Sequence, residues 1–252
     1  RRIALTGTPV ENRLAELWSI MEFCCPGFLG TNGDFRKRFA VPIERHRDER
    51  QARRLRELVQ PFILRRLKTD PNVITDLPPL VQSKQTVTPS EEQVQLYDAV
   101  VEEMLRKVDS AEGIRRRGLV LASLVKLKQI CNHPSHYLES IGMETGEIDP
   151  LRSGKSTRMM EMLEEVTATD DRALIFTQYR RMGHLLVSMI RHAFDIEPLF
   201  LHGGTPQMKR DQLVDRFQSK DPSCPIFILS LKAGGVGLNL TAANHVFHYD
   251  RW

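Results

Sequence analysis

Apolar residues recur at helical spacing near the start of the chain: Leu14, Leu17, Trp18 and Met21. This spacing predicts a helix that Asn12 caps and that ends before Pro26. A second helix is expected over residues 49–59, because its leucines and valine lie on one side and mostly arginine on the other. The first sixty residues therefore predict a helical region with a basic surface.

Helical spacing is lost between residues 61 and 79, where prolines fix a partly extended path: Pro61, Pro71, Pro78 and Pro79. We interpret this stretch as a linker. Thr88-Pro89-Ser90-Glu91 then predicts the start of a long helix, with a capping box and Pro89 at the first helical position. A further helix is expected to end at Asn132-His133-Pro134.

Beyond Gly146 the pattern changes to short apolar strands that alternate with amphipathic helices. The expected strands are residues 173–176, 198–201, 225–229 and 245–249, and the helices between them centre on residues 159–166, 185–193 and 206–217. This alternation predicts an α/β fold, with a parallel sheet covered by helices on both faces. Ligands usually bind at the carboxyl ends of such strands.

The composition of the 252-residue chain, with 41% hydrophobic and 27% charged residues, is that of a globular protein. No apolar run reaches the roughly 18 residues that a membrane span requires, so we expect no membrane association. The four cysteines lack C-x-x-C spacing, which favours a reducing compartment. Cys131, His133 and His136 lie close together, but Pro134 interrupts them and a fourth ligand is lacking, so no metal site is expected.

The net charge of +4 is unevenly distributed along the chain. Residues 36–68 carry 12 basic and 4 acidic side chains, whereas the remainder is slightly acidic. Two interpretations stay open for this basic stretch: a solvated helical face, or a surface that binds phosphates.

Both ends of the sequence are apolar and strand-like, over residues 1–9 and 245–252. Unpaired apolar strands promote aggregation, so we expect these residues to be part of a longer protein.

Three strand-to-loop transitions carry residues suited to ligand binding: Leu5-Thr6-Gly7-Thr8-Pro9, Phe176-Thr177-Gln178-Tyr179 and residues 230–240. The third is the most informative, since its glycines allow a close backbone approach and its Ser230 and Lys232 suit a phosphate backbone. Gly154-Lys155-Ser156 is similar to the end of a Walker loop, but no apolar strand leads into it. We interpret it as a helix N-terminus.

Six segments in succession resemble motifs of the Swi/Snf-type family of helicase-like ATPases. They are LTGTP at 5–9 with EN at 11–12, FILRRLKTD at 62–70 with LPP at 77–79, LKQICNHP at 127–134, ALIFTQY at 173–179, HGGT at 202–205, and residues 230–252. These segments cover the chain from end to end, and their order is that of the family.

The resemblance implies a double-stranded DNA translocase with two RecA-like lobes. Residues 1–9 would end the first lobe (motif III), and residues 10–60 would form its helical protrusion. Residues 61–82 would link the lobes, and residues 83–150 would form the protrusion of the second lobe. Residues 151–252 would be the RecA-like second lobe, the helicase C-terminal domain, up to motif V.

The resemblance also assigns roles to individual residues. Contacts with the DNA backbone would come from five residues of the second lobe: Thr177, Gln178, Gly203, Ser230 and Lys232. The side of the cleft that faces ATP would include Gly235, Gly237 and Asn239. Coupling between the lobes would involve Thr6, Gly7 and Thr8, and Arg65 and Arg66 would brace the linker.

ATP and Mg²⁺ are the cofactors that the resemblance implies for the intact protein, and neither is expected to bind these residues alone. The Walker loop, the D-E-x-H motif and the arginine fingers would lie before Arg1 and after Trp252, so no catalytic residue is expected here. The partners would be double-stranded DNA and the first lobe of the same chain, in a monomeric protein. A bacterial source would place it in the cytoplasm or nucleoid, and a eukaryotic source in the nucleus.

Two alternatives stay open. The protein could be a catalytically inactive relative that only binds DNA or docks partners. It could also be a strand-separating helicase, although simpler helicases have little between motifs III and IV, where about 160 residues intervene here.

Overall fold

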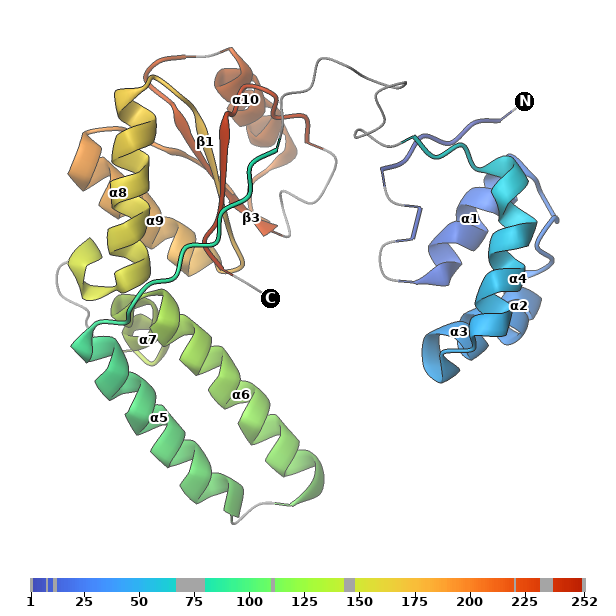
Figure 1. The fold of residues 1–252 in the computed structure, drawn as a ribbon, viewed down its shortest axis with the longest axis horizontal. Coiled ribbons are helices and arrows are strands. Elements are labelled where there is room, and N and C mark those ends of the chain that lie inside the picture. Colours follow the sequence, from blue (N-terminus) through green and yellow to red (C-terminus); the bar gives the residue numbers. More distant parts are fainter. Residues whose placement is uncertain are drawn as a thin grey trace. The chain divides into compact units, whose positions relative to one another are not determined.

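The computed structural model describes residues 2–7, 9–10, 13–66, 80–109, 112–142, 148–219, 221–231 and 238–250. The chain forms two compact units, Arg1–Ser83 and Lys84–Trp252, which are shown in Figure 1. Among the described residues, no helix combines the length and apolar character that a membrane crossing requires.

The first unit is helical. Its elements are α1 (Leu14–Cys24), α2 (Asn32–Phe35), a π-helical turn η1 (Arg36–Ala40), α3 (Val41–His46), α4 (Glu49–Val59) and a 3₁₀ turn η2 (Gln60–Phe62). They enclose a small core of Leu17, Met21, Leu29, Phe35, Phe39, Ala40, Leu55 and Val59. The bounds expected for the basic helix are confirmed, and Asp48 caps it by accepting the N–H groups of Arg50 and Gln51 at 2.9 and 3.1 Å.

Two expectations for the first unit are wrong. The cap position of α1 is Arg13, and the first free N–H, that of Leu14, donates to the Glu44 carboxylate of α3 at 2.7 Å. Asn12 lies outside the described residues. Residues 2–7 form no strand, and Ile3 and Leu5 are exposed, because no described strand lies beside them to pair with their backbone.

The second unit begins with a helical hairpin, α5 (Glu91–Asp109) and α6 (Gly113–Asn132), followed by α7 (Pro134–Ser140). A capping box does start α5, but the prediction placed it two residues early. Ser90, not Thr88, caps the helix: its Oγ accepts the Gln93 N–H at 3.1 Å, and its own N–H donates to Gln93 Oε1 at 3.0 Å.

The predicted parallel α/β sheet is confirmed. It contains β1 (Ala173–Thr177), β2 (Leu199–Leu201), β3 (Ile226–Ser230) and β4 (His245–His248) in the order β2-β3-β1-β4, and every pairing is parallel. The turn η3 (Pro150–Arg152) and α8 (Gly154–Ala168) precede β1, α9 (Arg180–Phe194) connects β1 to β2, and α10 (Gln207–Gln218) connects β2 to β3.

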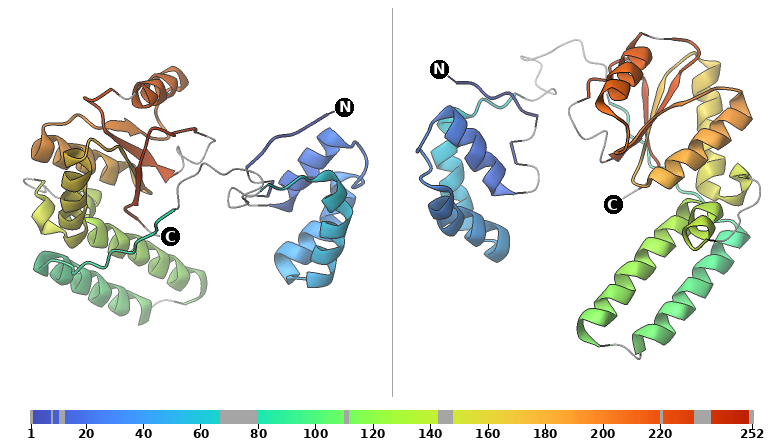
Figure 2. Two further views of the ribbon diagram at one scale, coloured as in Figure 1. Left: turned by 45° about the horizontal axis from the view of Figure 1, so that its top comes forward. Right: turned by 180° about the vertical axis from the view of Figure 1, so that it is seen from behind.

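Alternate strand residues face opposite sides of this sheet. Ala173 and Ile175 join the core that α8 and α9 cover, whereas Leu174 joins the core that contains Phe217 of α10. Figure 2 shows α8 and α9 on one face and α10 on the other. Burial on both faces explains why β1 and β3 are continuous apolar runs, whereas the edge strand β4 alternates between half-buried and exposed residues.

Candidate functional site

The carboxyl ends of the four strands lie at one edge of the sheet. Thr177 ends β1 and is in register with Ser230, which ends β3. Gln178 follows β1, the loop from His202 follows β2, and Tyr249 and Asp250 follow β4. Parallel topology therefore brings together residues that are more than 70 positions apart in sequence.

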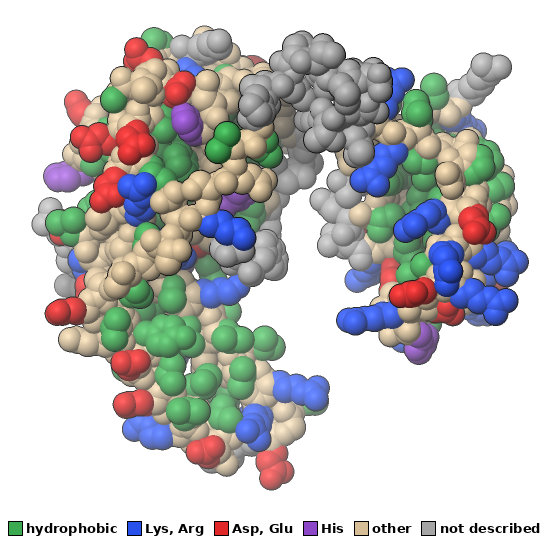
Figure 3. Space-filling view, viewed as in Figure 1, with side chains coloured by type: hydrophobic (Ala, Val, Ile, Leu, Met, Phe, Trp, Pro, Cys, Tyr) green, Lys and Arg blue, Asp and Glu red, His purple; other side chains and the backbone are tan. Residues whose placement is uncertain are grey.

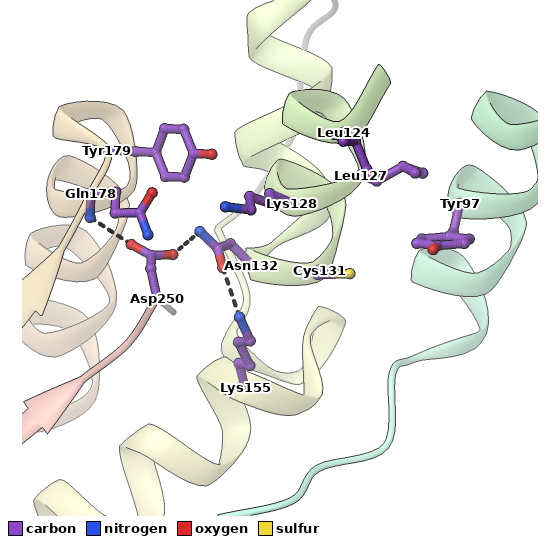
Figure 4. Close-up of a pocket in the computed structure, with 10 residues that line it drawn as sticks. All are labelled: Tyr97, Leu124, Leu127, Lys128, Cys131, Asn132, Lys155, Gln178, Tyr179 and Asp250. Atoms are coloured by element: carbon purple, nitrogen blue, oxygen red, sulfur yellow. Dashed lines mark hydrogen bonds between the residues drawn. The ribbon is translucent and has the colours of Figure 1, made fainter. Parts of the chain in front are cut away.

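Asp250 is the centre of a buried polar network at this edge and is 7% exposed. One carboxylate oxygen accepts the hydroxyl of Thr177 and the Gln178 N–H, the latter at 2.7 Å. The other oxygen accepts the side-chain amide of Asn132 at the end of α6. Asp250 thus joins the sheet edge to the helical hairpin, as Figure 4 shows.

Asn132 extends the network to α8 and β4. Its side-chain oxygen accepts Lys155 Nζ at 2.9 Å, and its backbone carbonyl accepts the Tyr249 hydroxyl at 2.8 Å. Burial lowers the pKa of Lys155, while the nearby Asp250 carboxylate opposes that shift. Burial raises the pKa of Tyr249, so its phenol is a neutral donor. The arrangement fixes the end of α6 against the sheet.

A cavity of about 220 Å³ lies beside this network. Its lining comes from α5, α6, α8 and the ends of β1 and β4 (Figure 4): Tyr97, Leu124, Leu127, Lys128, Cys131, Asn132, Lys155, Gln178, Tyr179 and Asp250. Two lysines and one buried carboxylate give the cavity wall charges of both signs, and the rest of the wall is largely apolar or aromatic.

Two hydroxyls expected at the surface are buried. Thr177 is fully buried with its hydroxyl bound to Asp250, and Ser230 is 6% exposed. The contact of Thr177 with a DNA backbone stays a prediction. The Thr177 hydroxyl is bound to Asp250 in this structure. Its position indicates that Thr177 holds Asp250 in place.

The structure places the other predicted site residues as follows. Gln178 lines the cavity, and Gly203 is exposed in the loop after β2, where its carbonyl accepts Arg210 at 3.3 Å. Asn239 is exposed. The remaining described ones are exposed and lie in the first unit: Thr6, Gly7, Arg65 and Arg66. Thr8, Lys232, Gly235 and Gly237 lie outside the described residues, as does the linker from 67 to 79.

Gly154-Lys155-Ser156 starts α8, as predicted. The cap is Ser153, whose side chain accepts the Ser156 N–H at 3.4 Å. Lys155 points to Asn132 and not to a phosphate loop. Asn132, Lys155 and Asp250 were not predicted as site residues, although an Asp directly after a strand is a recognisable sequence signal at such an edge.

The histidines after α6 are buried in the neutral form. His133 Nδ1 accepts the Ser135 N–H at 3.1 Å, while its Nε2 lies 3.0 Å from the Asp149 carbonyl. His136 packs its ring on Tyr179 at 4.8 Å, and its buried Nδ1 has no hydrogen-bond partner among the described residues. Among these residues, no group of three His, Cys, Asp or Glu side chains is arranged to hold a metal ion.

Stability should therefore fall as the pH drops below about 6.5. Burial, Arg181 and His133 lower the pKa of His136 to about 4. In the unfolded chain the same histidine has a pKa near 6.5. Between pH 6.5 and 4 the unfolded state therefore binds a proton that the folded state does not, which lowers the free energy of unfolding by up to about 3 kcal/mol. Urea unfolding from pH 7.5 to 4 measures this loss. His136→Phe should flatten the profile, whereas substitution of the exposed His192 by glutamine should not, and an unchanged profile in His136→Phe would contradict the assignment.

Comparison with known proteins identifies the family. Residues 1–136 match the SNF2-related domain, and residues 154–252 match the helicase conserved C-terminal domain. The first match continues past the division between the two compact units, into α7.

Named relatives match almost the whole chain. The Bacillus subtilis protein YwqA, whose name describes an ATP-dependent helicase/translocase, is 45% identical over 250 residues, which are 99% of this chain and 27% of that protein. The DNA excision repair protein ERCC-6 of Mus musculus is 30% identical over 271 residues, 99% of this chain and 18% of that protein. The chain thus spans about a quarter or less of these curated relatives.

The fold also matches a solved structure, the Sulfolobus solfataricus SWI2/SNF2 ATPase core in complex with double-stranded DNA. The TM-score is 0.63 at 41% identity, over all of this chain and 52% of that one. With a family match over more than half of its residues, the chain belongs to the SNF2-related family of helicase-like ATPases.

Proposed function

We propose that this chain is part of an ATP-dependent double-stranded DNA translocase, in which ATP hydrolysis between two RecA-like lobes drives movement along DNA. The observation that carries the proposal is the match of the entire chain to an ATPase core solved with double-stranded DNA. The sheet edge supports it, since the carboxyl ends of parallel strands are where such folds bind ligands.

In this proposal the two described units correspond to different parts of the two lobes. Residues 10–60 form the protrusion of the first lobe after its end at residues 1–9, and residues 61–82 link the lobes with Arg65 and Arg66 as a brace. Residues 83–150 form the protrusion of the second lobe, and residues 151–252 form that lobe. Thr6, Gly7 and Thr8 couple the lobes.

The ligand contacts follow the sheet edge. Gln178, Gly203, Ser230 and Lys232 would contact the DNA backbone, through main-chain groups where the side chain is buried. Gly235, Gly237 and Asn239 would face ATP and its Mg²⁺. Thr177 would act indirectly, since it holds Asp250 beneath this surface. The Asp250–Asn132 hydrogen bond would keep the helical hairpin fixed to the lobe as the lobes move.

The experiment is an ATPase and translocation assay of the longer protein that contains these residues. Duplex DNA should stimulate hydrolysis, and the protein should displace a third strand from a triplex without unwinding a tailed duplex. Duplex binding without hydrolysis would instead identify a catalytically inactive DNA-binding relative. Unwinding of the tailed duplex would identify a strand-separating helicase.

The 252-residue chain on its own should show no DNA-stimulated ATP hydrolysis. Its sequence contains no Walker loop, no D-E-x-H motif and no arginine-finger motif, and phosphoryl transfer depends on positioning by all three. Phosphate release should equal that of a mock purification, with and without duplex DNA. Turnover above that background that co-purifies with the chain would contradict this expectation.

A further inference from the structure

The first unit carries a dense group of exposed cations outside the sheet edge described above. Nine basic side chains between positions 36 and 56 are exposed: Arg36, Lys37, Arg38, Arg45, Arg47, Arg50, Arg53, Arg54 and Arg56. We call this set the basic face. Figure 3 shows Lys and Arg side chains gathered over the helices of this unit.

Nearby acids do not neutralise the basic face. Glu44 accepts the Leu14 N–H at 2.7 Å, and Asp48 accepts two backbone N–H groups at the start of α4. Among the described residues, every ion pair within 4 Å belongs to the second unit, and none involves a member of the basic face. The charges of the basic face therefore remain available to an external ligand.

The packing of α4 turns part of this set outward. Leu55 and Val59 are buried against the core of the first unit. Arg50, Arg53 and Arg54 are three and four positions apart, so they share the opposite side of the helix and are exposed. The helix is thus fixed by its apolar side, and it presents about one arginine for each 5.4 Å turn.

The chemistry of the basic face fits a phosphate backbone. Eight of its nine members are arginine, whose planar guanidinium binds phosphate through two parallel hydrogen bonds. Duplex DNA presents about one negative charge per 1.7 Å of its axis, so it can engage several of these cations at once. An extended acidic peptide carries at most one charge per roughly 3.3–3.6 Å, which is about half the charge density of the duplex.

We propose that the basic face binds the phosphate backbone of duplex DNA, as a contact separate from the sheet edge of the second unit. This inference rests on the proposed function for its choice of ligand. Its contribution is sequence-independent, so it would hold the protein on DNA without reading bases.

The test compares two triple variants of the 252-residue chain. Arg50→Gln/Arg53→Gln/Arg54→Gln removes three charges from the basic face, and Arg115→Gln/Arg116→Gln/Arg117→Gln removes three exposed arginines from α6 in the second unit. Affinity for a labelled duplex is measured by fluorescence anisotropy over a salt series, after circular dichroism has confirmed that both variants are folded.

The α4 triple variant should raise the Kd about tenfold near 0.1 M salt. It should also make the plot of log affinity against log salt shallower by about 2 to 3, because each lost phosphate contact removes about 0.9. The α6 triple variant should leave the slope unchanged. Glu57→Gln, which removes an exposed acid beside the α4 arginines, should tighten binding.

Equal losses in both triple variants, or no change in either, would overturn the inference. So would tighter binding of polyglutamate than of duplex DNA, which would indicate an acidic protein partner. An unchanged slope alongside duplex-stimulated hydrolysis by the longer protein would reject the basic face and leave the proposed function standing. The expected change in slope without duplex-stimulated hydrolysis by the longer protein would support the basic face and reject the proposed function.

Discussion

Replacement of Asp250 by alanine is expected to lower the free energy of unfolding of the second unit by about 3–5 kcal/mol. The substitution leaves the buried Thr177 hydroxyl, the Gln178 N–H and the buried Asn132 amide without their acceptor. It also removes the negative charge that opposes the desolvation of Lys155. Removing one partner of a buried charged interaction, so that the remaining partners are left without a hydrogen bond, typically costs this much free energy.

Pulse-labelling hydrogen exchange along a urea series, followed on peptides from β1 and β3, measures this loss in the unit concerned. Asp215→Ala is the matched control, because Asp215 is exposed on α10, and it should stay within about 0.5 kcal/mol of the parent. Asp250→Asn should lie between the two, since one amide oxygen can still accept. A loss below 1 kcal/mol in Asp250→Ala would show that the network does not hold the sheet edge.

Local signals predicted much of this fold. The bounds of α4 were predicted from its arginines on one side and Leu55, Leu58 and Val59 on the other, all within eleven successive residues. The four strands follow from short apolar runs between helical patterns. In both cases the residues that decide the structure are neighbours in sequence, so periodicity alone is sufficient.

The start of α5 shows where local reasoning fails. Thr88 and Ser90 are both plausible caps by sequence, and the choice depends on distant residues. The Ser90 hydroxyl also donates to the Arg152 carbonyl at 2.7 Å, and Gln93 Oε1 accepts the Gly154 N–H at 3.3 Å. These contacts span about sixty positions, and no pattern around residue 90 reports them.

The candidate site also contains features that local sequence predicts and features that depend on distant residues. The apolar runs predicted that the two strands end at Phe176 and Leu229, one residue before their observed ends at Thr177 and Ser230. No local pattern could show that both hydroxyls are buried. The Thr177 hydroxyl is bound by Asp250, which follows β4 and is in turn bound by Asn132, 118 positions earlier. Such a polar network is specified only when the fold brings Asn132, at the end of α6, next to the residues that follow β1 and β4.

Gly154 is difficult to replace because it lies against the backbone of Thr88, and Gly154→Ala should lower the free energy of unfolding by about 3 kcal/mol. An added Cβ would overlap the carbonyl oxygen of Thr88 and lie 3.0 Å from its carbonyl carbon. Because these are backbone atoms, no rotamer change relieves the contact, and the cost falls at the upper end of that for overpacked sites. The start of α8, with Lys155, would have to separate from residues 88–93.

Gly118→Ala is the control, since Gly118 is exposed inside α6 and a Cβ there meets nothing within 4 Å. That substitution should stabilise the chain by about 0.5–1 kcal/mol, because alanine loses less backbone entropy than glycine in a helix. Urea unfolding should therefore give changes in the free energy of unfolding of opposite sign for the same glycine-to-alanine substitution at the two positions. If Gly154→Ala also stabilised the chain, the close approach of α8 to Thr88 would be wrong, and with it the position of Lys155 beside Asn132.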